Sequence, residues 1–266
     1  MTAASAPPAQ RRALVGGATS GLGRACAAAL LADGLDVLLW SRDAERLAAT
    51  AGQLRAVHPG REVTTVAADA ADPGAARTVA AVATAGGPVD TVVLNAGGPP
   101  PVSALDTDPE QWHRSFQMLA LTPIELATRL LPGMRAAGFG RVLAVLSSGV
   151  REPLPRLAYS NACRAALSAW LKTVTREVAG DGVTVNSVLP GRIDTPRVAA
   201  LDAATAQREG RDAADVAAES RAGIPVGRYG RPEEFAAVVA FLASPAAGYV
   251  TGVGIACDGG VGHSNP

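Results

Sequence analysis

The chain has 266 residues, of which 48% are hydrophobic and 18% are charged, and its 24 basic residues equal its 24 acidic residues in number. This length and composition predict one globular domain with a large buried core. A net charge of zero offers no basic face, so nucleic acid and acidic lipid surfaces are excluded as partners. The basic residues comprise 23 Arg and a single Lys, Lys172.

The cysteines and the N-terminal segment indicate where the protein works. Cys26, Cys163 and Cys257 are far apart and odd in number, which predicts no disulfide framework and no metal site. No stretch reaches the roughly 18 apolar residues of a membrane span. Residues 1–11 are rich in Ala and Pro and lack the apolar segment of a signal peptide. We therefore expect a cytoplasmic protein with a disordered tail over residues 1–11 and no membrane partner.

Short apolar runs alternate about seven times with longer segments rich in Ala, Leu and Arg. The runs do not alternate regularly between apolar and polar residues, which is typical of strands buried on both faces of a parallel sheet. We expect strands at residues 13–15, 37–40, 63–67, 89–94, 142–146, 183–189 and 254–257. We expect helices at residues 21–32, 44–57, 74–84, 109–137, 157–179, 196–222 and 232–242. This order predicts an α/β protein with a single-domain Rossmann fold over residues 12–266. Its doubly wound, seven-stranded parallel sheet would place a ligand beyond the carboxyl ends of the strands.

A glycine-rich loop follows the first expected strand and precedes the first expected helix. It reads Gly16-Gly17-Ala18-Thr19-Ser20-Gly21-Leu22-Gly23. Glycines allow a tight turn and a close approach of backbone to a pyrophosphate, while the helix N-terminus offers free N–H groups. The loop therefore indicates a dinucleotide site.

From about residue 12 to residue 260, the chain resembles a known family, the classical short-chain dehydrogenases/reductases. The glycine loop is similar to TGxxxGxG, with Gly16 in place of Thr, and residues 94–97 resemble NNAG. Residues 190–195 match PGxxxT, and the stretches 227–234, 241–244 and 258–260 follow the C-terminal third of the family. Within the family the chain looks most like bacterial 3-oxoacyl-acyl-carrier-protein reductases.

The resemblance implies a cofactor site at the strand ends. Its expected residues are Gly17, Ser20, Gly21, Leu22, Gly23, Ser41, Arg42, Asp69, Ala70, Asn95, Ala96, Gly97, Pro190, Gly191, Ile193 and Thr195. The second strand ends in Ser41-Arg42. NAD-binding sites usually have a carboxylate at this position, which accepts a hydrogen bond from the ribose 2′-OH, and this chain has none there. A guanidinium is a forked phosphate ligand, so NADP(H) is expected over NAD(H). The alternative is that Arg42 caps a helix or pairs with Asp43 or Glu45.

The family uses Asn, Ser, Tyr and Lys in catalysis, and the resemblance carries over two of them. Ser147 matches the Ser that holds the substrate oxygen, with Ser148 as an adjacent alternative. Tyr159 is expected to exchange the proton, although it follows Ser147 by twelve residues, one fewer than the family spacing. In this register the Lys position is Cys163 and the Asn position is Leu119.

Two other basic residues, Arg164 and Lys172, are candidates for the role of the missing Lys. On a helix Lys172 is rotated by ~220° from Tyr159 and Arg164 by ~140°, whereas position 163 shares its face at ~40°. Arg164 could replace Lys only if its long side chain bends across the helix; otherwise it packs or pairs with Glu177 or with Asp181 of a partner. Cys163 is expected to be a small buried residue.

The leading hypothesis is an NADP(H)-dependent carbonyl reductase with Tyr159 as proton donor and Ser147 holding the oxygen. A phenol is protonated at neutral pH without help from Lys, so reduction would be favoured over alcohol oxidation. Two other classes remain open: a redox-inactive protein that binds cofactor or ligand, and a non-redox enzyme using Tyr159 and Ser147 for proton transfer in a specialised biosynthetic pathway. The resemblance further implies a homodimer or homotetramer formed through residues 109–137 and 157–179, and a substrate lid at about residues 196–223.

Overall fold

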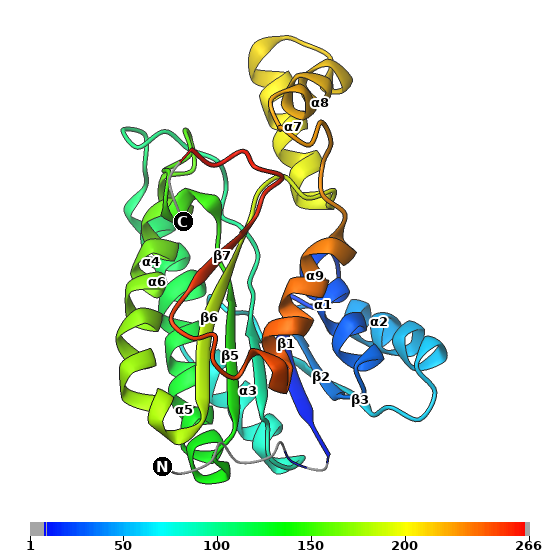
Figure 1. Ribbon diagram of the computed structural model, residues 1–266. Helices are drawn as coiled ribbons and strands as arrows, with labels where there is room; N and C mark the ends of the chain where they lie inside the picture. Colours follow the sequence, from blue (N-terminus) through cyan, green and yellow to red (C-terminus); the bar gives the residue numbers. More distant parts are fainter. Residues whose placement is uncertain (1–7, 9, 264–266) are drawn as a thin grey trace.

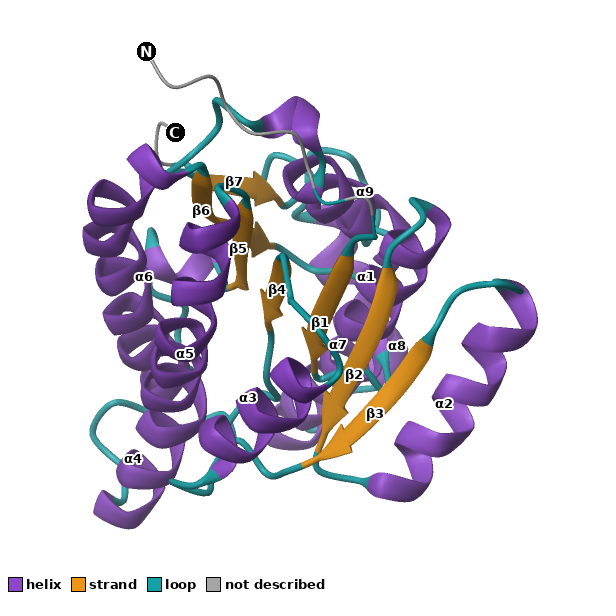
Figure 2. Cartoon of the chain, turned by 90° about the horizontal axis from the view of Figure 1, so that it is seen from below, coloured by secondary structure: helices purple, strands orange, loops and turns teal. Residues whose placement is uncertain are grey.

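The computed structural model describes residue 8 and residues 10–263. Its strands form one parallel sheet with the order β3-β2-β1-β4-β5-β6-β7, seen from one end in Figure 2. The strands are β1 (Arg12–Gly16), β2 (Asp36–Ser41), β3 (Val63–Ala67), β4 (Thr91–Leu94), β5 (Gly140–Val145), β6 (Val183–Pro190) and β7 (Gly254–Cys257). This sheet confirms the predicted doubly wound Rossmann fold, because the strand order runs outward in both directions from β1 and β4.

Helices cover both faces of the sheet. They are α1 (Gly21–Ala32), α2 (Ala44–Val57), α3 (Ala75–Ala85), α4 (Pro109–Phe116), α5 (Thr122–Ala137), α6 (Ala158–Val178), α7 (Pro196–Glu209), α8 (Ala213–Ala222) and α9 (Pro232–Ala243). One apolar core lies between the sheet and α3, α5 and α6, and the other lies between the sheet and α1, α2 and α9. Because β1, β4 and β5 are buried along their whole length, their apolar runs show no alternation.

The expected helix at residues 109–137 is interrupted by a π-helical turn, η1 (Gln117–Leu121). The Thr122 N–H donates to the carbonyl oxygen of Gln117, five residues earlier, where an α-helix would use the residue four earlier. The next residue, Pro123, has no N–H to donate. The wider turn places the segment before α5 against α6, where Leu119 is buried.

The expected helix at residues 196–222 is divided into α7 and α8. Gly210 adopts a left-handed conformation (φ 64°) that ends α7, and Asp212 caps α8 by accepting from the backbone N–H of Ala214. Figure 1 shows both helices standing beyond the carboxyl ends of the strands, away from the body of the sheet.

The structure also differs from the expectation at the start of the chain. Most of the predicted tail lies outside the described residues, but Arg11, its last residue, forms an ion pair with Asp90 at 2.7 Å. Among the described residues no helix is both long and apolar enough to cross a membrane.

The buried Asp90 side chain links the central strands at their N-terminal ends. Its Oδ2 accepts from the backbone N–H of Arg12 at 2.7 Å, and its Oδ1 accepts from Arg11 Nη2 and from the hydroxyl of Thr91, each at 2.7 Å. Asp90 is 4% exposed, so loss of its carboxylate would leave these donors unpaired in the interior.

We expect Asp90→Ala to lower the free energy of unfolding by about 3 kcal/mol, since removal of one partner of a buried ion pair leaves the other uncompensated. Urea denaturation measures this loss. The control is Arg129→Ala, which breaks an exposed pair with Glu125 and should cost about 0.5 kcal/mol or less. Equal losses in the two variants would contradict the role assigned to Asp90.

Candidate active site

A cavity of about 1030 Å³ lies at the carboxyl ends of the strands. All but one of the expected cofactor residues line it: Gly17, Ser20, Gly21, Leu22, Ser41, Arg42, Asp69, Ala70, Asn95, Ala96, Gly97, Pro190, Gly191, Ile193 and Thr195. Gly23 lies beneath the loop instead, where a Cβ atom would come within 2.3 Å of the Gly17 carbonyl oxygen. The sequence motifs therefore converge on one cavity, and Gly23 serves the packing of helix α1 against the loop.

The glycine loop is closely packed on the end of β4. Asn95 Nδ2 donates to the Gly16 carbonyl oxygen at 3.0 Å, and a Cβ at position 16 would approach the Asn95 carbonyl oxygen to 2.4 Å. Gly17 has φ 60°, a left-handed conformation that favours glycine. Ser20, the N-cap of α1, makes no side-chain cap hydrogen bond, so the first turn of α1 remains available to an anion. This arrangement fits a pyrophosphate.

The adenosine end of the cavity is marked by Arg42 and Asp69. Asp43, rather than Arg42, caps α2, since its side chain accepts from the backbone N–H of Arg46 at 3.0 Å. Arg42 forms no ion pair within the described part of the chain, although its charge acts on Asp69. Burial raises the pKa of Asp69, but hydrogen bonds from Ala71 and Arg114 and the charges of Arg114 and Arg42 hold that pKa below its ordinary value.

Tyr159 does not line the cavity. Its hydroxyl oxygen accepts from the backbone N–H of Asp108 at 2.6 Å, and its ring meets that of Trp112 edge-on at 4.8 Å between centroids. The side chain is 2% exposed, held between α6 and the start of α4. This placement departs from the expectation that Tyr159 faces the substrate.

The next residue, Ser160, lines the cavity in its place, together with Ser147. Ser160 follows Ser147 by thirteen residues, the spacing that the resemblance implies. One residue along a helix is a rotation of about 100°, so Ser160 faces the cavity while Tyr159 faces α4. Four residues further on, Arg164 shares the face of Ser160 and also lines the cavity.

Under the thirteen-residue spacing that the resemblance implies, the motif would be read one residue later, with Ser160 at the Tyr position and Arg164 at the Lys position. Cys163, the residue expected at the Lys position, is fully buried, and burial raises the pKa of its thiol to about 11. Lys172 donates to the carbonyl of Gly252 at 2.7 Å on the surface, away from the cavity. The twelve-residue interval from Ser147 to Tyr159 was the sequence signal for this shift.

Arg164 is a buried cation that bonds mainly to uncharged groups. Its Nη1 donates to the Val145 carbonyl oxygen at 2.6 Å, at the end of β5, and its Nε donates to the Ser160 hydroxyl at 3.3 Å. Burial, followed by the nearby positive charge of Arg197, lowers the pKa of Arg164 to about 10. The guanidinium is therefore still protonated at neutral pH.

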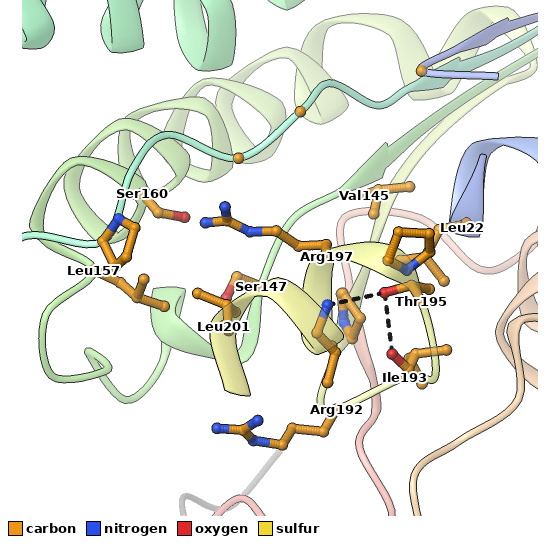
Figure 3. A pocket seen from close by; sticks show the side chains of 18 of the residues that line it. Leu22, Val145, Ser147, Leu157, Ser160, Arg192, Ile193, Thr195, Arg197 and Leu201 are labelled. Atoms are coloured by element: carbon orange, nitrogen blue, oxygen red, sulfur yellow. Dashed lines mark hydrogen bonds between the residues drawn. The ribbon is translucent and has the colours of Figure 1, made fainter. Parts of the chain in front are cut away.

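A second cation, Arg197, enters the cavity from the first turn of α7. Figure 3 shows its side chain extended across the cavity toward Ser160. Its Nη2 donates to the Pro99 carbonyl oxygen at 2.8 Å, and its guanidinium packs over Gly98, where a Cβ atom would come within 2.7 Å. No sequence motif pointed to Arg197, because its role depends on the path of the segment after PGxxxT.

Ser147, which follows Leu146 after the end of β5, lines the same cavity. Its hydroxyl oxygen accepts from the backbone N–H of Gly149 at 3.1 Å, which leaves the O–H proton free to donate into the cavity. The two hydroxyl groups of Ser147 and Ser160 and the Arg164 guanidinium thus provide hydrogen-bond donors beside the dinucleotide half of the cavity. Such a site can hold a polarised oxygen atom and stabilise negative charge on it.

Comparison with known proteins supports the same interpretation. A family model described as Enoyl-(Acyl carrier protein) reductase matches residues 17–262. The cis-4-hydroxycyclohexanecarboxylate dehydrogenase of Sinomonas cyclohexanicum is 36% identical over 95% of this chain and 96% of its own.

Solved structures agree with the sequence comparisons. YwfH, an NADPH-dependent reductase of bacilysin biosynthesis, superposes with a TM-score of 0.92 at 27% identity, over 97% of this chain and 100% of its own. An actinorhodin polyketide ketoreductase variant solved with NADPH superposes with a TM-score of 0.91 at 29% identity, over 96% and 98% of the two chains. Both neighbours agree with the expected cofactor, and the ketoreductase agrees with the expected closeness to 3-oxoacyl-acyl-carrier-protein reductases. From its motifs, its sheet and these relatives, the chain belongs to the short-chain dehydrogenase/reductase family.

Proposed function

We propose that the protein is an NADP(H)-dependent carbonyl reductase whose active site is formed by Ser147, Ser160 and Arg164. The observation that carries this proposal is the continuity of one cavity. It joins a glycine loop suited to a pyrophosphate with Ser147, Ser160 and Arg164. The NADPH-dependent reductase and ketoreductase among the structural neighbours, and the hydroxy-acid dehydrogenase among the relatives, support redox chemistry between a carbonyl and an alcohol.

The residues present fit the adenosine phosphate and the pyrophosphate of the cofactor. The loop and the first turn of α1 would hold the pyrophosphate, Arg42 and Ser41 the 2′-phosphate, and Asp69 the adenine. When bound, NADPH supplies a hydride to the carbonyl carbon of the substrate.

The protein contributes the proton and the electrostatic stabilisation of the oxygen. Ser147 and Ser160 would donate hydrogen bonds to the carbonyl oxygen, and the Arg164 guanidinium would stabilise the negative charge that develops there. Arg164 Nε donates a hydrogen bond to the Ser160 hydroxyl oxygen. This bond orients the Ser160 hydroxyl so that the Ser160 proton points away from Arg164. In this scheme Ser160 passes its proton to the alkoxide and regains one from solvent.

Tyr159 remains the alternative proton donor. To act, its hydroxyl would have to leave the Asp108 backbone and its ring the Trp112 contact, and the side chain would have to turn by about 100° around the helix. The geometry therefore favours Ser160.

Two further features of the proposal concern the surroundings of the site. Phe116, at the end of α4, and Leu121, at the end of η1, are 39% and 45% exposed, and both belong to the segment 109–137 that is expected to form a homodimer or homotetramer. Helices α7 and α8 contribute Val198, Leu201 and Val216 to the wall of the cavity, as a substrate lid would.

Arg42→Ser should raise the Kd for NADPH by roughly 10- to 100-fold, because a charge-assisted contact with the 2′-phosphate is lost. The Kd for NADH, which lacks this phosphate, should change by less than about twofold, and NADH serves as the control within the same variant. Fluorescence titration measures both constants. An equal loss for both cofactors would contradict 2′-phosphate recognition by Arg42.

Ser160→Ala should lower kcat for ketone reduction by about 100-fold or more, the range for loss of a general acid. Tyr159→Phe, which changes only a hydroxyl bonded to backbone, should leave kcat within about threefold. Steady-state kinetics with NADPH and a ketone panel compares the two. A large loss in Tyr159→Phe with little loss in Ser160→Ala would restore Tyr159 as the donor. Binding of NADPH without its consumption would favour a redox-inactive or non-redox protein.

The pH dependence should report the charge of Arg164. Its pKa is lowered, so the protonated, stabilising form predominates below about pH 10 and is lost as pH rises through that value. We expect kcat/KM for reduction to be level at neutral pH and to fall about tenfold per pH unit above pH 10. Arg164→Met should be slower at neutral pH and lack this decline, and an unchanged decline in that variant would assign it to another group.

A further inference from the structure

The inner part of the cavity, near Ser160, holds two arginine side chains, Arg164 and Arg197, that no carboxylate neutralises within the described residues. Neither Arg164 nor Arg197 forms an ion pair among the described residues, and the charge of Arg197 contributes to lowering the pKa of Arg164. Their partners in hydrogen bonds are the backbone carbonyls of Val145 and Pro99 and the hydroxyl of Ser160.

The carboxylates that border the cavity are engaged elsewhere. Asp69 pairs with Arg114 at 2.9 Å, and Asp43 caps α2. Glu209 pairs with Arg208 at 2.6 Å and with Arg211, and Glu219 pairs with Arg211 at 2.6 Å. None of these ion pairs involves Arg164 or Arg197, so the inner part of the cavity keeps a net positive charge.

Two like charges in a largely buried site repel each other and lose hydration. Burial lowers the pKa of Arg197, and burial together with Arg197 lowers that of Arg164. An anion between the groups would relieve both penalties, because opposite charges attract strongly where water is scarce. The site is therefore complementary to a ligand that brings its own negative charge.

The position of Arg197 separates this anion from the phosphates of the cofactor. The pyrophosphate is assigned to the glycine loop and the 2′-phosphate to Arg42. Arg197 instead crosses the cavity toward Ser160, with Leu157 and Leu201 nearby in Figure 3. It thus lies where a substrate would place its reacting carbonyl group.

We propose that Arg197, supported by the charge of Arg164, binds a carboxylate group of the substrate, and that the natural substrate is a keto acid whose carboxylate lies within a few bonds of its carbonyl. A guanidinium presents two parallel N–H donors that match a planar carboxylate. Arg197 Nη2 is used by Pro99, and Nη1 and Nε form no hydrogen bond among the described residues, so donors remain. This substrate class rests on the proposed function and differs from that of a reductase acting on neutral acyl thioesters.

Binding to the NADP⁺-loaded protein tests the proposal separately from turnover. The probes are acetoacetate, phenylpyruvate and benzoylformate, each with its methyl ester, and calorimetry measures each Kd. At least one acid should bind about tenfold or more tightly than its ester, and Arg197→Met should reduce that ratio to about twofold or less. Arg197→Lys, which keeps the charge, should restore part of the preference.

A matched control distinguishes a direct contact from a general loss of charge. Arg208→Met removes one positive charge at the mouth of the same cavity, from a residue already paired with Glu209. The acid-to-ester ratio should stay within about twofold of the wild-type value in this variant.

Three outcomes would overturn the proposal. The first is equal affinity of acids and esters for the wild-type protein, and the second is the absence of binding by every acid. The third is a rise in the Kd for NADPH in Arg197→Met with an unchanged acid-to-ester ratio, which would assign Arg197 to the cofactor. Selective binding of an acid without NADPH consumption would retain the anion site and contradict only the reductase function.

Discussion

The proposed active site depends on the burial of one guanidinium group, that of Arg164, at the end of β5. The Val145 carbonyl fixes this group by accepting from Nη1, and Ser160 receives a hydrogen bond from Nε. Because Arg164 and Ser160 are four residues apart on α6, they present their polar groups on the same face of the helix. The cation contacts the Ser160 hydroxyl and lines the same cavity as Ser147, so developing negative charge could be stabilised there without a lysine.

The cofactor half of the site could be predicted from sequence because it depends on backbone geometry. Gly16, Gly17 and Gly23 are positions where a Cβ atom would collide with a carbonyl oxygen or a neighbouring side chain. Such requirements leave glycine as the residue that fits, so they are visible as motifs. Strands such as β1, β4 and β5 were predictable for a similar reason, since strands buried on both faces consist mainly of apolar residues.

The catalytic half could not be predicted in the same way because it depends on the direction of side chains. A shift of one residue turns a helix face by about 100°, which exchanges Tyr159 for Ser160 and Cys163 for Arg164. Tyr159 lies next to the residue that faces the cavity, and the short interval from Ser147 to Tyr159 is the feature of the sequence that agrees with the proposed role of Ser160. Arg197 and the π-helical turn near Pro123 required the three-dimensional path of the chain, since neither belongs to a motif.

The most direct test of this account is a crystal structure of the protein with NADPH and a non-reacting analogue of its substrate. The account predicts that the Ser147 and Ser160 hydroxyls lie within hydrogen-bond distance of the ligand oxygen, with Arg164 beside them and the Tyr159 hydroxyl still on the Asp108 backbone. A structure in which the Tyr159 hydroxyl contacts the ligand oxygen and Ser160 faces away would contradict it.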